Sequence, residues 1–320
     1  MKKKTSSIIL PFVIVALSSC SFSIDFDSSQ SSSASTGGSS DSTGVSTSGD
    51  SSESSESSSS ISLSSSSSSF DSPYVPGGYS LAWSDEFAGS ALDSASWEHQ
   101  IGNGSWGWGN GESEYYTASN DAVTDGNLVI TAKKETMGGQ AYTSTRIRTY
   151  QKVSTTYGYI EAKIKLPPVQ GMWPAFWMLP ENSYQGVGWP GAGEIDIMEN
   201  RGRVANVTSG ALHYASDGTG NTHTYKTAET SVGSISEWHV YALLWTEEAI
   251  TWFVDGSAFL TVGRSTWNSG YGTGDSAPFN APFHLILNLA IGGQFDNWNL
   301  PPSDFEEATM SVDYVRIYAQ

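Results

Sequence analysis

Two kinds of residue are scarce in this sequence of 320 residues. Cysteine occurs once, as Cys20, so a disulfide within one chain is impossible. Lys and Arg together number 15 against 33 acidic residues, which gives a formal net charge of −18. We expect no nucleic-acid partner, because binding to phosphates depends on basic side chains. A neutral partner such as a polysaccharide is compatible with this charge.

The apolar run near the start is too short to span a bilayer. It covers residues 8–17 and follows Lys2, Lys3 and Lys4, a pattern typical of a secretory signal. The ending Leu-Ser-Ser-Cys resembles the lipobox of bacterial lipoproteins. This implies a signal peptide at 1–19, a lipid on the thiol of Cys20, and attachment at the cell envelope or cell surface. An ordinary signal peptide with an incidental cysteine is the alternative.

Residues 20–72 also lack the apolar side chains that could form a core. The segment is mostly serine with some glycine, threonine and acids, so it predicts a disordered tether. About fifty residues of such a chain have an end-to-end distance on the order of 40 Å. The remaining residues, 73–320, are predicted to form one folded domain.

This domain shows no long stretch of helical periodicity. Short runs rich in β-branched and aromatic residues recur between turn residues and predict strands. The runs are NLVITAK, YGYIEAKIKL, MWPAFWML, EIDIME, HVYALLWT, AITWFVDG, FHLILNLAI and SVDYVRIY. Asp255-Gly256 predicts a hairpin turn. We therefore expect an all-β fold, a sandwich of two stacked antiparallel sheets.

Aromatic residues are more frequent than a core of this size requires. All 12 tryptophans lie between Trp83 and Trp298, so the rings fill the core, face a ligand, or do both. Strand alternation places Trp173 and Trp177 on one face, which is either a ligand surface or core. The same alternation in YGYIEAKIKL predicts a solvent-exposed face that includes Glu161.

The segment GEIDIMEN, residues 193–200, carries three acids in an apolar run. Regular alternation would send Glu199 to the opposite face from Glu194 and Asp196. Three explanations compete: Glu199 lies beyond the strand and is solvated, the acids bind a cation such as calcium, or a β-bulge after Asp196 restores Glu199 to the shared face.

A bulge would place the three acids where they could act together in one reaction. Ile195, Ile197 and Met198 would then face the core while the carboxylates point outward together. Neighbouring carboxylates differ in their affinity for protons, so one can be an anion while another stays protonated. Two carboxyl groups about 5–5.5 Å apart are what retaining glycoside hydrolysis uses.

GEIDIMEN resembles the E-x-D-x-x-E motif of glycoside hydrolase family 16, in its laminarinase-like (endo-β-1,3-glucanase) branch. The flanking segments are similar to those of the family, in the same order. They are WSDEF, WGNGESEYYT, DGNLVITA, YGYIEAKIKLP, GMWPAFWMLP, ALHY, LNLAIGG and VDYVRIY. The resemblance covers nearly everything after residue 78 and implies a jelly-roll sandwich of the concanavalin A type with a concave substrate cleft.

The resemblance also implies residue roles. Glu194 would be the nucleophile, Glu199 the acid/base and Asp196 the assisting acid. The other residues that match the family's substrate-binding positions are Trp173, Trp177, His213, Asn110 and Arg146, with Asn288 and Gln294 as weaker candidates. We assign His99, His223, His239 and His284 to structural or surface positions.

Glu86, the Gly126 carbonyl and Asp313 resemble a structural calcium site of the family. No organic cofactor is implied. The expected function is retaining endo-hydrolysis of β-1,3-glucosidic bonds in a β-glucan by a monomeric enzyme. The alternatives are a mixed-linkage β-1,3-1,4-glucanase, a non-catalytic β-glucan-binding module and, less favoured, a galactan hydrolase.

Overall fold

The strands of this protein follow the alternation of its side chains. In β5 (Asn127–Lys133), Leu128, Ile130 and Ala132 are buried while the residues between them are only partly covered. All eight predicted runs form strands in the computed structural model, which describes residues 72–181, 188–217, 220–267 and 277–320. Asp255 and Gly256 both have positive φ, as a two-residue hairpin turn of type I′ requires.

The strands form two sheets. The first sheet has the spatial order β16 (Ser257–Gly263), β15 (Ala249–Val254), β14 (His239–Trp245), β9 (Gly158–Lys165), β18 (Glu307–Ala319), β5, β6 (Tyr142–Ser144), β3 (Glu114–Tyr116). Two further strands pair with its members: β1 (Ser80–Asp85) with β18, and β4 (Asp121–Thr124) with β5. Its described pairs are antiparallel except β3 with β6.

The second sheet carries the candidate site. Its order is β13 (His223–Ser231), β12 (Val207–Ala215), β11 (Glu194–Glu199), β10 (Met172–Pro180), β17 (Phe283–Ile291), β7 (Arg146–Arg148), β2 (Glu98–His99), with β8 (Ser154–Thr155) pairing β17. The short helical turns are η1 (Gly107–Gly111), α1 (Arg264–Trp267) and η3 (Gln294–Asp296).

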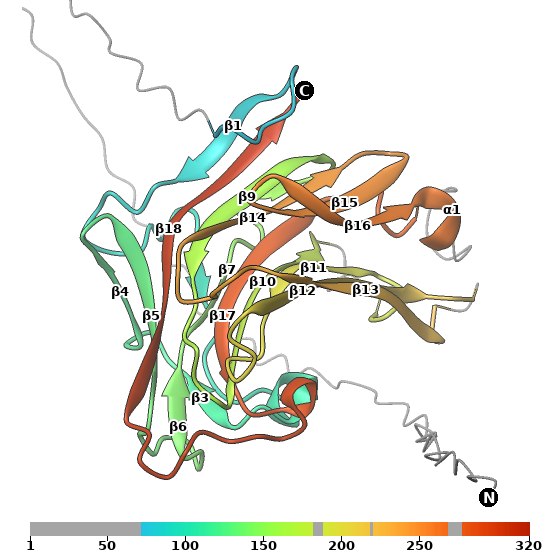
Figure 1. Ribbon diagram of the computed structural model, residues 1–320. Coiled ribbons are helices and arrows are strands. Elements are labelled where there is room, and N and C mark those ends of the chain that lie inside the picture. The colour runs from blue at the N-terminus through green and yellow to red at the C-terminus, as the bar shows by residue number, and fades with distance from the viewer. Residues whose placement is uncertain (1–71, 182–187, 218–219, 268–276) are drawn as a thin grey trace, which may run out of the picture. The chain divides into compact units, whose positions relative to one another are not determined.

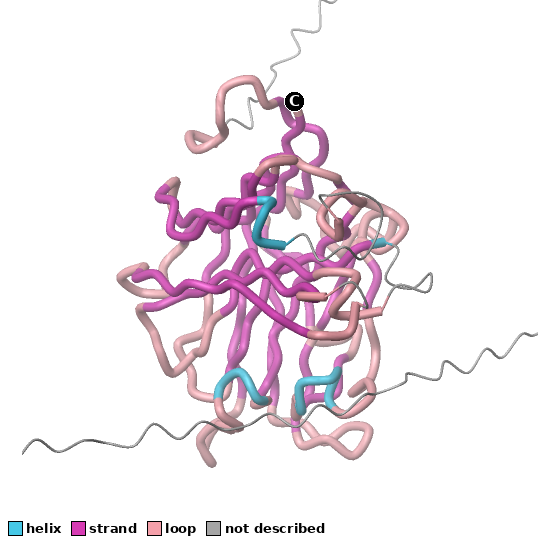
Figure 2. The backbone as a smooth tube through the Cα atoms, turned by 90° about the vertical axis from the view of Figure 1, so that its right-hand side faces the viewer, coloured by secondary structure: helices cyan, strands magenta, loops and turns pink. Residues whose placement is uncertain are grey.

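The two sheets stack face to face (Figure 1), and the view turned by 90° shows the same layers with η1 and η3 at one end of the strands (Figure 2). The core between the sheets joins inward side chains of both, such as Phe176 and Leu287 from the second and Ile160 and Trp252 from the first. The predicted β-sandwich is therefore confirmed.

The predicted β-bulge is present in β11. Opposite β12, Asp196 pairs with Ala211 and Glu199 pairs with Ser209, so two residues of β11 face the single residue Gly210. Opposite β10, Trp177 pairs with Asp196 and the next residue, Phe176, pairs with Met198. This extra residue reverses the facing of every side chain that follows it.

The opposite sheet supports the bulge. A bulge interrupts the hydrogen-bond ladder, and buried carbonyl groups then need another donor. Trp252, on β15, donates its indole Nε1–H to the Asp196 carbonyl at 2.8 Å. The indole can approach because a Cβ on Gly210 would lie only 2.5 Å from Trp252 Cδ1.

The predicted exposed face of β9 is wrong in its first half, although Lys165 at the end of the strand is exposed. Tyr159 and Glu161 on β9 are 1% and 0% exposed. The start of the domain covers them: Val75 and Tyr79 pack against the cluster that contains Tyr159, and Ser72 donates a hydrogen bond to Glu161. Ser72 was predicted to end the tether, yet it is buried in the domain.

The predicted signal peptide and tether, apart from Ser72, lie outside the described residues. Within the described ranges, no helix has the length and hydrophobicity needed to cross a membrane.

The Gly210→Ala variant tests the contact beneath the bulge. The added methyl group would force the buried Trp252 ring to move, so we expect the free energy of unfolding to fall by about 1–3 kcal/mol. Chemical denaturation measures this change. Gly263→Ala on β16 is the control, because its Cβ would meet nothing within 4 Å. Equal stability of the two variants would contradict the proposed contact.

Candidate active site

The bulge places three acids on one face of the second sheet. We call this face the site face; it carries Glu194, Asp196 and Glu199, while Ile197 and Met198 are 1% and 0% exposed in the core. Asp196 is 4% exposed, and the two glutamates are half-buried. The sequence-based explanation by a bulge is therefore correct, and Glu199 is not a solvated residue beyond the strand.

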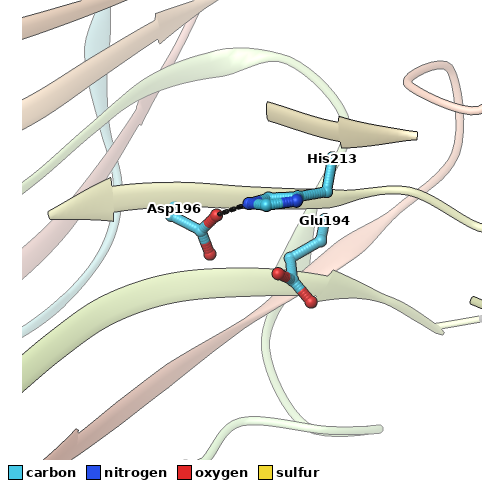
Figure 3. A group of neighbouring side chains, drawn as sticks. All are labelled: Glu194, Asp196 and His213. Carbon is cyan, nitrogen blue, oxygen red and sulfur yellow. Dashed lines mark ion pairs between the residues drawn. The ribbon is translucent and has the colours of Figure 1, made fainter. Parts of the chain in front are cut away.

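His213 joins this group from the neighbouring strand β12. It lies opposite Glu194, and its Nε2 is 3.2 Å from Asp196 Oδ2. Figure 3 shows Glu194, Asp196 and His213 converging from the two strands. Glu199 has a different partner, since Trp173 donates its indole Nε1–H to Glu199 Oε1 at 2.9 Å.

Burial raises the pKa of all three carboxyl groups. For Glu194, burial is the largest cause, the Asp196 charge adds to it, and His213 opposes it. Burial and the Asp196 charge raise the pKa of Glu199 as well, while His213 and the Trp173 hydrogen bond oppose the shift. Burial alone raises the pKa of Asp196. Because the Asp196 charge raises the pKa of both glutamates, ionisation of one acid in this group disfavours ionisation of its neighbours.

The group also has the composition of a metal site. One potential ligand atom from each of Glu194, Asp196 and His213 lies within 4.8 Å of the others, and no other such group of three occurs in the described part of the chain. Glu199 does not belong to this group. Its separate bond to Trp173 indicates that the acids have distinct roles rather than one shared ligand role.

Strands β10, β17 and β7 carry a hydrogen-bonded aromatic network beside the acids. Trp177 Nε1 donates to Asn288 Oδ1 at 2.7 Å, Asn288 Nδ2 donates to the Tyr116 hydroxyl at 3.2 Å, and that hydroxyl donates to Glu112 Oε2 at 2.8 Å. These partners fix the orientation of the half-buried Trp177 ring. Trp173 is 8% exposed and stacks on Phe295 with ring centroids 5.0 Å apart.

The predicted residues Arg146 and Asn110 belong to the same network. The Arg146 guanidinium lies 4.5 Å from the Trp108 ring centroid and 4.8 Å from that of Trp177, and the residue is 5% exposed. Asn110 donates to Glu112 Oε1 and accepts from Gln294. The structure thus gives both residues a role in positioning the network, while their direct contact with a sugar stays a prediction.

Comparison with known proteins identifies the family. The family model described as glycosyl hydrolases family 16 matches residues 110–316, which include the three acids, both tryptophans of β10 and His213. The chain belongs to glycosyl hydrolase family 16.

Family-16 relatives align with most of the domain. The chain is 38% identical over 264 residues to a glucan endo-1,3-beta-glucosidase A1 from Niallia circulans, which covers 76% of this chain and 38% of that protein. It is 38% identical over 251 residues to a beta-glucanase from Rhodothermus marinus, and the match covers 75% of this chain and 85% of that protein. The laminarinase catalytic domain from Thermotoga maritima MSB8 superposes with a TM-score of 0.67 and 36% identity. The superposition covers 76% of this chain and 98% of the Thermotoga domain. The chain thus spans well under half of the Niallia protein.

The residues predicted to hold calcium in this family-16 chain come together along β18. Asp85 pairs with Val315 and Leu128 pairs with Val312, so Glu86, Gly126 and Asp313 lie near one stretch of that strand. Both side chains of this set, those of Glu86 and Asp313, have cationic partners. Both carboxylate oxygens of Glu86 accept hydrogen bonds from Arg316 at 2.8 Å, and Asp313 Oδ2 lies 2.6 Å from Lys163 Nζ. The Glu86 carboxylate therefore does not fit a calcium ligand, whereas Asp313 Oδ1 and main-chain carbonyls such as that of Gly126 remain suitable donors.

Sequence reasoning missed several residues of the site. His223 was assigned to a structural or surface position, but it contacts His213, with 2.9 Å between His213 Nδ1 and His223 Nε2. Tyr225 and Trp189 lie beside these histidines. The alternation in HTYKT predicts that His223 and Tyr225 share a face, but only the pairing of β12 with β13 shows that this face is the site face.

The acids are expected to lower the stability of the fold at neutral pH. Burial and neighbouring charge raise the pKa of Glu194 from 4.5 to about 8, so the folded state holds this proton where the unfolded state has lost it. The free energy of unfolding therefore falls as pH rises from about 4 to 8. We expect Glu194→Gln to raise Tm at pH 7 by roughly 2–4 °C, the shift that about 1 kcal/mol produces in a domain of this size.

Calorimetric scans at pH 4 and pH 7 measure this effect. The gain should vanish near pH 4, where the parent carboxyl is neutral in both states. Glu307→Gln, which replaces an exposed glutamate on β18, is the control and should leave Tm unchanged. A Tm for Glu194→Gln that equals the parent value at pH 7 would contradict the expected cost of burying this acid.

Proposed function

We propose that this chain is a retaining endo-glycoside hydrolase that cleaves internal β-1,3-glucosidic bonds of laminarin-type β-glucans. The observation that carries the proposal is the bulge in β11, which gathers two glutamates and an aspartate on one face beside Trp173 and Trp177. Family membership supports it, as do the names of the glucan endo-1,3-beta-glucosidase and the laminarinase to which the chain is similar.

The proposed chemistry has two steps. In the first, the Glu194 carboxylate attacks the anomeric carbon, the glycosidic C–O bond breaks, and the departing oxygen takes a proton from Glu199. In the second, a water molecule attacks the anomeric carbon of the glycosyl-enzyme while Glu199 takes its proton, and the bond to Glu194 breaks. The two inversions restore the original configuration.

The positions of the other residues suit these steps. The Trp173 hydrogen bond holds the Glu199 carboxyl group in one orientation. His213 lies next to Asp196. It opposes the rise in the pKa of Glu194, and so it favours the ionised form of the proposed nucleophile. The Trp177 ring, fixed by Asn288, offers an apolar face for a pyranose ring.

The Glu194→Gln variant tests the catalytic proposal. A glutamine cannot attack the anomeric carbon, so we expect kcat on laminarin to fall by about 10³-fold or more in a reducing-sugar assay. NMR of the parent's first product should show the β-anomer, as retention requires.

The same assays separate the alternatives. A Glu194→Gln variant as active as the parent, or a parent without hydrolytic activity, would favour a glucan-binding module. Inversion of configuration would exclude Glu194 as the nucleophile. A higher initial rate on mixed-linkage β-1,3-1,4-glucan than on laminarin would favour the mixed-linkage alternative.

We propose a structural role for calcium at the Gly126 and Asp313 oxygens near β18, supported by their register on that strand. Addition of about 1 mM calcium to the chelator-treated protein should raise Tm, because a ligand that binds only the folded state stabilises that state. Asp313→Asn should reduce the rise. A Tm that calcium does not change would contradict the proposal.

We also propose that the enzyme is a monomer tethered to the cell envelope by a lipid on Cys20. The support is the sequence of residues 1–72. Incorporation of a labelled fatty acid into the parent but not into Cys20→Ala would test the anchor.

A further inference from the structure

Two buried glutamates that the proposed reaction does not use lie beside the Trp177 network. Glu112 follows η1 in an extended conformation and Glu114 begins β3, so their side chains point to the same side of the chain. Asn103 holds this segment, because its side-chain amide donates to the main-chain carbonyls of both residues, at 3.2 and 2.7 Å. Glu112 is 6% exposed and Glu114 is 0% exposed. The fold therefore shields two neighbouring carboxyl groups from water.

The hydrogen-bond donors around these two carboxyl groups differ. Glu112 accepts from Asn110 Nδ2 at 3.0 Å and from the Tyr116 hydroxyl at 2.8 Å. Glu114 Oε2 accepts the main-chain N–H of Ile291 at 2.6 Å. The other oxygen, Glu114 Oε1, is buried and accepts no hydrogen bond from the residues that the structure describes. Glu112 thus has the surroundings of an anion, whereas Glu114 Oε1 has those of a protonated oxygen.

A proton on Glu114 removes the conflict between the two acids, which we call the glutamate pair. Two facing carboxylates repel each other and have no donor between them, whereas a protonated carboxyl group donates its O–H to its neighbour. Burial is the largest cause that raises the pKa of Glu114, and the Glu112 charge and the hydrogen bond between the two side chains add to it. The Ile291 N–H opposes the rise. These surroundings favour one proton and one negative charge for the pair.

Other charged and titratable groups face the glutamate pair from β3 and β7. Burial and the charges of the pair raise the pKa of Tyr116 well above its usual value, so its hydroxyl keeps its proton and donates it in a hydrogen bond. Arg146 opposes this rise and supplies a buried positive charge near the pair. Tyr142 of β6, which pairs with Glu114 along the backbone, packs against Phe305. The elements β17 and η1 contribute uncharged amide groups.

The hydrogen bonds of the network all run toward Glu112. The Trp177 indole donates to Asn288 at 2.7 Å, and Asn288 donates to the Tyr116 hydroxyl at 3.2 Å. That hydroxyl donates to Glu112 at 2.8 Å. A chain of bonds that ends on an anion is stronger than one that ends on a neutral acceptor, and each bond strengthens the next. The charge on Glu112 therefore sets the direction of every bond as far as the Trp177 ring.

We propose that Glu112 and Glu114 hold one proton between them and that this pair positions the side chains that contact the glucan. Those side chains are Trp177, reached through Tyr116, and Asn110, which donates to Glu112 directly. The proposal rests on the proposed function and adds two positioning residues to it. The proton on Glu114 keeps the single charge of the pair on Glu112, where both chains of hydrogen bonds need their acceptor.

The proton is detected by NMR of the full chain labelled with ¹³C at glutamate Cδ, because ionisation shifts this resonance. At pH 7 we expect Glu114→Gln to remove the signal of a protonated carboxyl group. Glu307→Gln, at an exposed position of β18, is the control and should remove the signal of a carboxylate. Loss of a carboxylate signal in Glu114→Gln would overturn the proposal.

Kinetics on laminarin test the positioning role with the same substitution at both glutamates. Glu112→Gln removes the charge on which the donors converge. We expect KM to rise about tenfold and kcat to change less than about threefold, since one hydrogen bond to a charged group is weakened. Glu114→Gln places an amide N–H where the proton lies and keeps an acceptor for Ile291, so KM should rise less than about threefold. Tyr116→Phe breaks the chain one step later and should also raise KM, which keeps the test valid if Glu112→Gln does not fold.

Equal KM values for the two glutamine variants would overturn the proposal, because a general effect on packing would act on both. A fall in kcat of Glu112→Gln without a rise in KM would also overturn it, since the reacting acids would then be affected instead of the sugar contacts. Failure of the proposed function gives a different result. The parent would then not hydrolyse laminarin, while the NMR spectra would still show whether the pair holds a proton.

Discussion

One extra residue in β11 determines the direction of Glu199, and the rest of the site depends on it. Without the bulge, Glu199 would enter the core with Ile195 and Ile197. The bulge leaves the Asp196 carbonyl in need of a donor, and Trp252 supplies it from the opposite sheet. That indole reaches the strand only because Gly210 has no side chain. The packing between the sheets therefore supports the geometry of the acids on the other side of β11.

The burial of the three acids on β11 lowers the stability of the fold. Three carboxyl groups on one strand are shielded from water, and burial raises the pKa of each. A fold would be more stable if these acids were far apart and solvated by water. Retaining hydrolysis needs one of two neighbouring acids ionised and the other protonated, and crowding of this kind separates the affinities of neighbouring acids for protons. The two sides of β11 also differ: one holds a buried hydrogen-bonded network around Trp177, and the other carries a cluster of rings in which Trp189 and Tyr225 are exposed.

Much of this architecture is predictable from local sequence. Apolar alternation in segments such as 127–133 predicted strands, because such a strand places every second side chain in the core. The almost continuous apolar run at 283–291 predicted a strand that is buried along its whole length. The same alternation made a bulge one of three explanations for the acids of GEIDIMEN, and the register of β11 against its two neighbours decided for it. The buried face of β9 was not predictable, since Tyr159 and Glu161 are covered by Val75, Tyr79 and Ser72, residues distant in sequence. His223 was missed because a lone histidine on a polar strand has no local signal of its neighbours.

The sequence by itself determined the β-sandwich class and the presence of three acids in one strand, because hydrophobic period and charge act over a few residues. The tertiary structure decided which side chains hold those acids: Trp252 and His213 reach Asp196, Trp173 reaches Glu199, and the rings of β13 lie beside them. It also paired Glu86 with Arg316, which altered the expected calcium ligands. These contacts join residues up to 230 positions apart, and only strand order and register bring such residues together.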